Sequence, residues 1–317
     1  MDIRHRRLNK HFQSAITLVD TFSYLTYEDL ELCYKRLKLY ANEYASEVQD
    51  KIIILQCMYH PDEIIKIPYI TRFSDKYCKK INGKLYRIKE VTQIFKKGLF
   101  LTLTINPNNF SNPRIMKKTL SEAWNRLATL LKKKYGINLW IKTIEFTDSH
   151  IPHLHIMFFH DTWLDVNWLR GLWKKYGAGD IIRLEFIDTK YDIEDEEIKA
   201  YYPIDYIWKY IIKAYKEYDN EIEDPKAIKT KIWQWALRCR AFSVSEELVS
   251  LINRKTNSNF GLTTTYLKLL ILLGRKDIID VLRDKHYFIY ITSIPMNLAD
   301  EITDSNSLRR ILLTFYN

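Results

Sequence analysis

The sequence predicts an α+β fold, with an antiparallel sheet of the ferredoxin-like, split βαβ type and helices on one side. Three observations support this class. Apolar runs and helix-periodic segments alternate in the order strand, helix, strand, strand, helix, strand, helix. The turn at residues 147–152 sends the chain back beside the strand before it. The content of 22 Tyr, 14 Phe and 8 Trp with only 8 Gly and 8 Pro supplies a core and argues against long disordered stretches.

The elements follow from local patterns. Leu99 to Ile105 is an apolar run with two threonines, suited to a buried strand, and Asn106-Pro-Asn-Asn ends it. Residues 115–135 form a helix because large apolar side chains recur there at helical spacing, and basic residues with Gly136 end it. Further strands are expected at 139–146, 153–159 and 181–186. Helices are expected at 165–176 and from Pro203 onward.

The central elements define a domain at residues 66–250, flanked by largely helical extensions at 1–65 and 251–317. The acidic segment 188–197 is most simply a solvated connector. No run approaches the ~18 apolar residues of a membrane span, and the basic N-terminus lacks the apolar core of a signal peptide. Four cysteines show no zinc or disulfide spacing. These features predict a cytoplasmic protein of the host cell with no membrane partner.

Basic residues outnumber acidic ones by 49 to 39, giving a net charge of +10 and a pI near 9.1. This balance favours a polyanionic partner. Ten Lys or Arg fall within residues 66–97, with tyrosine and phenylalanine interleaved. Cations can follow a phosphate backbone while aromatic rings stack on bases, although a solvated surface over core aromatics would look similar. The candidate DNA contacts here are Arg72, Lys76, Lys79, Lys80, Lys84 and Arg87.

A divalent metal site is indicated by Pro152-His153-Leu154-His155. Alternation along a strand puts both imidazoles on one face. Glu145, eight residues before His153 across a short hairpin, is the best third ligand. Such a set suits Mn²⁺ or Mg²⁺ with open positions for phosphate oxygens. His150 and His160 are interpreted as turn residues or residues that support the ligands. The alternative for the His pair alone is two exposed or capped histidines.

The helix that begins near Pro203 carries a second cluster of reactive groups. Tyr206, Lys209, Tyr210 and Lys213 share one narrow stripe, while isoleucines and a tryptophan cover the opposite side. The apolar side can pack on the sheet while the stripe faces the metal. An ordinary amphipathic helix with a polar face is the alternative.

These patterns, in their order, resemble the HUH endonucleases, and among them the two-tyrosine rolling-circle replication initiators of small archaeal or bacterial plasmids and viruses. Phe100 to Thr104 is similar to the family's first motif, an apolar strand. Pro152 to Phe159 is similar to the His-hydrophobic-His strand. Tyr206 to Lys213 is similar to the tyrosine–lysine helix. The resemblance covers roughly residues 66–250 and implies the same fold.

The resemblance implies a metal-dependent, site-specific nickase and strand transferase. Glu145, His153 and His155 would hold Mn²⁺ or Mg²⁺, and a tyrosine would form a 5′-phosphotyrosine and leave a free 3′-OH. Tyr210 is the better candidate for the first nucleophile because Lys209 precedes it and Lys213 follows it. Tyr206 would be its partner. The implied partners are single-stranded DNA, origin duplex DNA, and a host helicase and polymerase.

Two other functions remain open from the sequence. A transposase or relaxase would use the same site, and a DNA-binding repressor would have lost catalysis. No Walker A motif is present, so a fused P-loop helicase is excluded. Downstream, Arg240 to Ser245 resembles a segment found after the tyrosine helix in several archaeal and phage initiators. Arg240, Ser243 and Ser245 could contact phosphate, or Ser245 could cap a helix.

Overall fold

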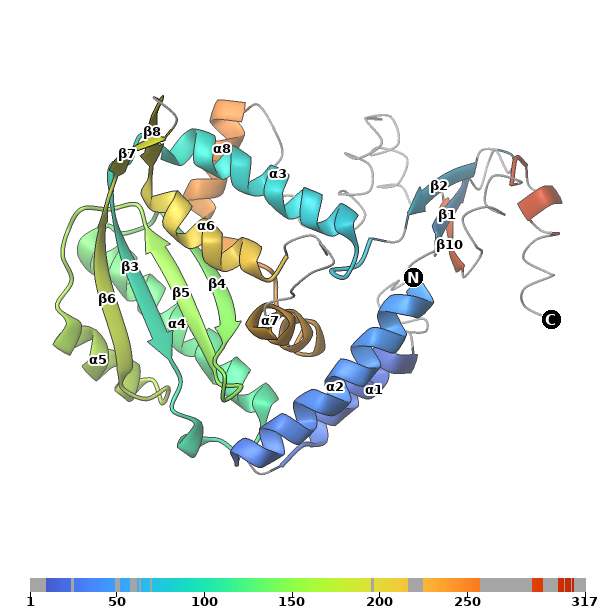
Figure 1. Ribbon diagram of the computed structural model, residues 1–317, viewed down its shortest axis with the longest axis horizontal. Helices are drawn as coiled ribbons and strands as arrows, with labels where there is room; N and C mark the ends of the chain where they lie inside the picture. Colours follow the sequence, from blue (N-terminus) through green and yellow to red (C-terminus); the bar gives the residue numbers. More distant parts are fainter. Residues whose placement is uncertain are drawn as a thin grey trace. The chain divides into compact units, whose positions relative to one another are not determined.

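The computed structural model describes residues 10–23, 26–48, 52–57, 62, 64–68, 70–194, 197–215, 225–256, 287–292, 302–304, 306–308 and 310 (Figure 1). The chain divides into two compact units. The first comprises residues 1–41 and 75–260, and the second residues 42–74 and 261–317. The expected functional boundaries at residues 65 and 250 stay predictions, because compactness does not test where an active module begins.

A five-stranded sheet organises the first unit. Its strands are β3 (Lys97–Thr104), β4 (Trp140–Phe146), β5 (Pro152–Phe158), β6 (Ile181–Asp188) and β9 (Ser243–Val244). The order is β6-β3-β5-β4-β9, and every neighbouring pair is antiparallel. Strand β5 lies between β3 and β4, as the split βαβ pattern requires. The predicted α+β class and the predicted order of elements are therefore confirmed.

Helix α4 (Pro113–Tyr135) joins β3 to β4, and α5 (Val166–Lys175) joins β5 to β6. The side chain of Asn112 caps the start of α4 by accepting from the N–H groups of Arg114 and Ile115, and Pro113 occupies the first turn. Gly136 ends the helix with φ of 68°. The sequence signals for this helix thus act as expected at both ends.

Helices cover both faces of the sheet, which corrects the expectation of helices on one side. Helices α4 and α5 cover one face (Figure 1), where Trp124 packs against Phe158. Helix α6 (Pro203–Lys213) covers the other, with α3 (Asp75–Thr92) and α8 (Glu246–Thr256) packed beyond it. The reason is that the second face also carries large apolar side chains, including Phe100 and Met157, which must be buried.

The remaining elements of the first unit are α1 (Lys10–Thr21), the N-terminal part of α2 (Tyr27–Val48), the short 3₁₀ helix η1 (Pro107–Asn109) and α7 (Pro225–Ala236). A hairpin of β7 (Lys190–Glu194) and β8 (Glu197–Tyr201) occupies the segment expected to be a solvated connector. That expectation is corrected: the acidic residues alternate with tyrosine and isoleucine, a pattern that a two-stranded ribbon accommodates.

The second unit contains an antiparallel sheet of β1 (Ile52–Cys57), β2 (Ile64–Pro68) and β10 (Tyr287–Thr292), in the order β10-β1-β2. The sequence analysis expected largely helical extensions here. Helices α1 and α2 agree with that, but these three strands do not. Isoleucine-rich runs favour strands, and the pairing of β1 with β10 joins segments far apart along the chain.

Two further expectations concern cysteines and membranes. Cys33, Cys78 and Cys239 are buried free thiols. Among the described helices, none has both the length and the apolar character needed to cross a bilayer.

Candidate metal centre and tyrosine helix

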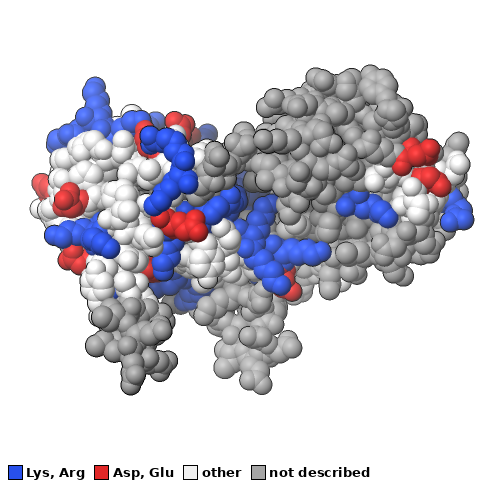
Figure 2. All heavy atoms as spheres, turned by 90° about the horizontal axis from the view of Figure 1, so that it is seen from above, with Lys and Arg blue, Asp and Glu red and all other residues white. Residues whose placement is uncertain are grey.

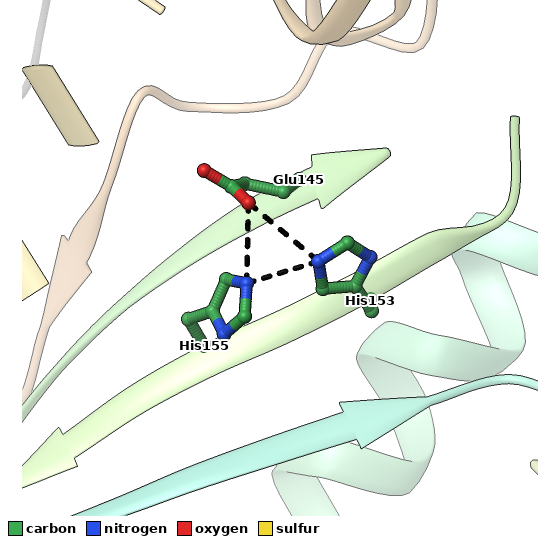
Figure 3. A group of neighbouring side chains, drawn as sticks. All are labelled: Glu145, His153 and His155. Atoms are coloured by element: carbon green, nitrogen blue, oxygen red, sulfur yellow. Dashed lines mark hydrogen bonds and ion pairs between the residues drawn. The ribbon is translucent and has the colours of Figure 1, made fainter. Parts of the chain in front are cut away.

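The register of the sheet brings the three predicted ligands together on one face. Glu145 on β4 lies directly opposite His153 on β5. His155, two residues further along β5, lies between Thr143 on β4 and Thr102 on β3. Because side chains alternate along a strand, Glu145, His153 and His155 all project from the face that α6 covers. Figure 3 shows them pointing toward one another.

The ligand atoms converge closely. The Nε2 atoms of His153 and His155 are 2.9 Å apart, and Glu145 Oε2 lies 3.2 Å from His155 Nε2 and 3.6 Å from His153 Nε2. One atom from each residue lies within 4.8 Å of the others, so the group could hold a metal ion. Two imidazoles and a carboxylate are a donor set that fits a divalent cation.

Electrostatics favour the protonation states that metal binding needs. Burial raises the pKa of Glu145, but hydrogen bonds from His153 and His155 outweigh this effect and bring it to about 2. Burial lowers the pKa of His155. At neutral pH the carboxylate is therefore ionised and His155 is neutral, and both can donate lone pairs to a cation.

Thr102 supports His155 from behind. Its Oγ1 lies 3.0 Å from His155 Nδ1. When Nδ1–H donates to this hydroxyl, Nε2 keeps its lone pair toward the other ligands. His153 differs, because its Nδ1 is buried without a hydrogen-bond partner among the described residues.

Local features of the sequence place α6 against this face. Pro203 stands in its first turn, and the Asp205 carboxylate accepts from the Tyr202 N–H at 2.9 Å. Lys89 on α3 donates to Asp205 at 2.7 Å. Gly98 allows the close approach, since a Cβ there would lie 3.0 Å from the Pro203 side chain and 2.8 Å from the Phe158 carbonyl oxygen.

The two tyrosines of α6 occupy different positions beside the metal group. Tyr210 packs directly on His155, with ring centroids 4.4 Å apart, and stacks on Phe100 at 5.2 Å. Tyr206 lies edge-on to Phe100 at 4.7 Å, and its ring is 5.8 Å from that of Tyr210. Lys209 places its ammonium 3.9 Å from the centre of the Tyr206 ring.

A pocket of about 430 Å³ opens beside the metal group. It is lined by the three ligands, by Tyr210 and Lys213 of α6, by the turn after β4 and by the N-terminal half of α7. Neither Tyr206 nor Lys209 belongs to its described lining. The structure thus groups Tyr210 and Lys213 with the metal ligands and separates the other half of the predicted stripe from them.

Tyr206 instead contacts a carboxylate that the sequence analysis missed. Its hydroxyl donates to Glu185 Oε2 on β6 at 3.3 Å. Burial raises the pKa of Tyr206, and the hydrogen bonds and charges of Tyr210 and Glu185 raise it further. Arg183 holds the other oxygen of Glu185 at 2.9 Å. Alternation along the predicted strand 181–186 could have paired Arg183 with Glu185, but not with Tyr206.

His150 and His160 lie outside the metal group. His150 is buried, accepts from Trp233 Nε1–H at 3.1 Å through Nδ1, and pairs with Glu31 at 2.8 Å through Nε2. These contacts tie the turn between β4 and β5 to α7 and α2. His160 accepts from the Thr162 N–H at 3.0 Å. Both therefore match the interpretation as turn residues rather than ligands.

The candidate DNA contacts are distributed over several places. Helical geometry puts Lys76, Lys80, Lys84 and Arg87 on one flank of α3 and Lys79 on another. Figure 2 shows basic side chains spread over the described part of this face with fewer acidic ones among them.

Other candidates lie apart from α3. Arg72 belongs to the second compact unit. Arg240 is exposed just before β9, at the edge of the central sheet. Ser245 accepts from the Leu248 and Trp140 N–H groups, so its hydroxyl caps α8 and supports β4.

Comparison with known proteins follows this geometry. Residues 98–215 match a family of replication-associated proteins of the ORF2 type. This segment runs from β3 to just past α6 and contains the metal group and both tyrosines. The match supports a replication initiator.

One curated relative is "Uncharacterized protein 1" of Halorubrum pleomorphic virus 1. It is 28% identical over 146 residues, which cover 43% of this chain and 29% of that protein. The aligned segment therefore spans less than a third of that relative. No solved structure matches the chain.

Proposed function

We propose that this protein is a two-tyrosine HUH initiator of rolling-circle replication for a small plasmid or virus. It nicks one strand of its origin through a 5′-phosphotyrosine and later rejoins the ends by strand transfer. The observation that carries the proposal is the pocket in which Glu145, His153 and His155 meet Tyr210 and Lys213. This pocket lies within the segment that matches the replication-associated family.

Each residue has a role in the first cleavage. Glu145, His153 and His155 would hold Mn²⁺ or Mg²⁺, which when bound withdraws charge from a phosphate oxygen. Tyr210 supplies the nucleophile. Its oxygen bonds to phosphorus, and the bond to the 3′ oxygen breaks. Lys213 lines the same pocket and offsets the negative charge that develops on phosphate.

The covalent ester keeps the energy of the broken bond, so a 3′-OH can reverse the step without ATP. The released 3′-OH serves as a primer for a host polymerase. Single-stranded DNA would follow the basic flank of α3, while origin duplex and a host helicase complete the expected partners in the host cytoplasm. The alternative within enzymes is a transposase or relaxase with the same site, and outside them a repressor that binds origin DNA.

The test uses labelled single-stranded oligonucleotides from the replicon's own origin. With Mn²⁺, wild-type protein should leave a protein–DNA adduct on the 5′ side of the nick, seen on a denaturing gel. Tyr210→Phe should abolish or greatly reduce first-strand cleavage, because only the nucleophile is removed. Tyr206→Phe should retain nicking but impair transfer. Tyr191→Phe, on the exposed β7, is the control and should behave as wild type.

Four outcomes discriminate among the alternatives. An adduct that persists in the Tyr206→Phe/Tyr210→Phe variant would place the nucleophile elsewhere. Origin binding without any adduct would favour the repressor. Nicking of the ends of a mobile element, with none at the replicon origin, would favour the transposase. Loss of nicking in Tyr206→Phe with activity in Tyr210→Phe would reverse the order of the tyrosines.

A further inference from the structure

Phe100 separates the two tyrosines into two environments. Its ring lies 5.3 Å from His155 and 5.2 Å from Tyr210 in stacked geometry, and 4.7 Å from Tyr206 edge-on. On one side of this ring, Tyr210 faces the metal pocket. On the other, Tyr206 is turned toward β6. Two nucleophiles in one site would ordinarily share their activating groups, so this separation asks what activates Tyr206.

Glu185 is the polar group that meets Tyr206. It lies directly across β3 from Phe100, so it projects from the same face of the sheet as the metal ligands. Its Oε2 accepts the Tyr206 hydroxyl at 3.3 Å, within the reach expected of a base that has not yet closed on its substrate. The carboxylate is half-buried, at the margin of the covered face.

Arg183 fixes the orientation and charge of this carboxylate. Its Nε lies 2.9 Å from Glu185 Oε1, while the Arg183 side chain itself is 74% exposed. One oxygen of Glu185 is therefore occupied by a cation and the other by the phenol. This arrangement of nucleophile, base and orienting group follows the general logic of activated nucleophiles.

Building on the function proposed above, we propose that Glu185 is the catalytic base for a second transfer carried out by Tyr206, with Arg183 as its positioning residue. The Tyr206 oxygen bonds to the phosphorus of a second origin copy, and the bond to its 3′ oxygen breaks. The phenolic proton passes to Glu185, and the departing 3′ oxygen takes a proton from solvent. The new 3′-OH can then attack the ester at Tyr210 and release a joined strand.

The experiment uses the full chain, Mn²⁺ and a single-stranded oligonucleotide that carries two copies of the nick sequence. First cleavage and strand joining are timed separately. Glu185→Gln keeps the shape and a hydrogen-bond acceptor but cannot take the proton. Joining should slow by about a hundredfold or more, while the first nick, made by Tyr210, slows far less.

Three further variants sharpen the assignment. Glu185→Asp keeps a base and should restore part of the joining rate, which a merely structural role would not predict. Tyr206→Phe should abolish the same step, and adding Glu185→Gln to it should change nothing more. Asp188→Asn removes a charge from an exposed position of the same strand and should join at the wild-type rate.

Joining at the wild-type rate in Glu185→Gln would overturn this assignment while leaving the proposed function intact. Equal slowing of the first nick and of joining would also overturn it, because Glu185 would then serve the whole site. If wild-type protein nicks no strand, the proposed function fails, and the assignment of Glu185 fails with it.

Discussion

A single hydroxyl behind the metal group sets the orientation of one ligand. Thr102 Oγ1 lies 3.0 Å from His155 Nδ1 and is directly opposite it on the neighbouring strand. Partners of this kind fix both the tautomer and the ring angle of a histidine ligand. A change at Thr102 should therefore alter metal affinity although Thr102 itself is no ligand.

We predict that Thr102→Val weakens Mn²⁺ binding by about ten- to a hundredfold, because valine keeps the volume and removes the hydroxyl. Calorimetric titration of the protein with Mn²⁺ measures this. Thr104→Val is the matched control, since Thr104 lies two residues along the same strand and face and should retain wild-type affinity. Equal affinities in the two variants would contradict the role of Thr102.

His150 gives a second residue-scale prediction, which concerns pH. Burial lowers its pKa, and its Nδ1 accepts from Trp233 Nε1–H, so the folded state requires the neutral ring. In the unfolded chain the ring takes a proton below its ordinary pKa of about 6.5. Stability from this contact is therefore complete above that pH and is lost as the pH falls below it. Protonation would set two N–H donors against each other, at a cost of about 1–3 kcal/mol.

The measurement is urea unfolding at pH 7.5 and 5.5. His150→Asn should be less stable than wild type at pH 7.5 but should lose less on acidification. Asparagine suits the test because residue 150 has φ of 63°, a conformation it tolerates. His160→Asn serves as a control outside the buried contact. A pH slope in His150→Asn equal to that of wild type would refute the prediction.

At the scale of elements, local patterns predicted what local geometry decides. The hairpin of β4 and β5 is short, so Glu145 could be placed beside His153 from spacing alone, and the structure brings them into register. The helical stripe of α6 followed from periodicity. Glu185 could not be found this way, because it meets Tyr206 through the pairing of β3 with β6 and the docking of α6. Such register is set by tertiary contacts rather than by local sequence.

The same reasoning explains the errors in the fold. Helices on one side were expected because the ferredoxin-like pattern was applied without asking what covers the face with Phe100 and Met157. The hairpin β7–β8 was missed because its charge obscured its alternation. The sheet of β1, β2 and β10 was missed because the partner of β1 is β10, near the other end of the chain.

Helix α3 carries the prediction that belongs to this scale. Changing Lys80, Lys84 and Arg87 to glutamine should weaken binding of single-stranded DNA. It should also reduce the slope of log affinity against log salt by about 2, because each lost phosphate contact removes ~0.7 from it. Fluorescence anisotropy over a series of salt concentrations measures both.

The matched control for α3 changes Lys118, Arg126 and Lys133 to glutamine. These exposed residues remove the same charge from α4, on the opposite face of the sheet. The control should bind with a slope close to wild type. If both triple variants lose equal slope, net charge rather than the α3 flank determines binding.

At the scale of the whole molecule, the site exists only when distant segments meet. The ligands come from β4 and β5, the nucleophiles from α6, and the pocket is closed by α7. An unfolded chain cannot present this arrangement. A divalent cation that binds it should therefore stabilise the folded state by mass action.

We predict that Mn²⁺ at a hundred times its dissociation constant raises the free energy of unfolding of the unit that carries the site by about 2.7 kcal/mol. Thermal unfolding with and without Mn²⁺ measures the shift, and a chelator should reverse it. Glu145→Gln should remove most of the shift, because it keeps the side-chain shape but loses the ionised ligand. Asp161→Asn, an exposed acid outside the metal group, should keep it. Nicking should disappear with the same chelator and return with either Mn²⁺ or Mg²⁺. A full shift in Glu145→Gln, or undiminished nicking after exhaustive chelation, would show that the metal is held elsewhere or is not needed.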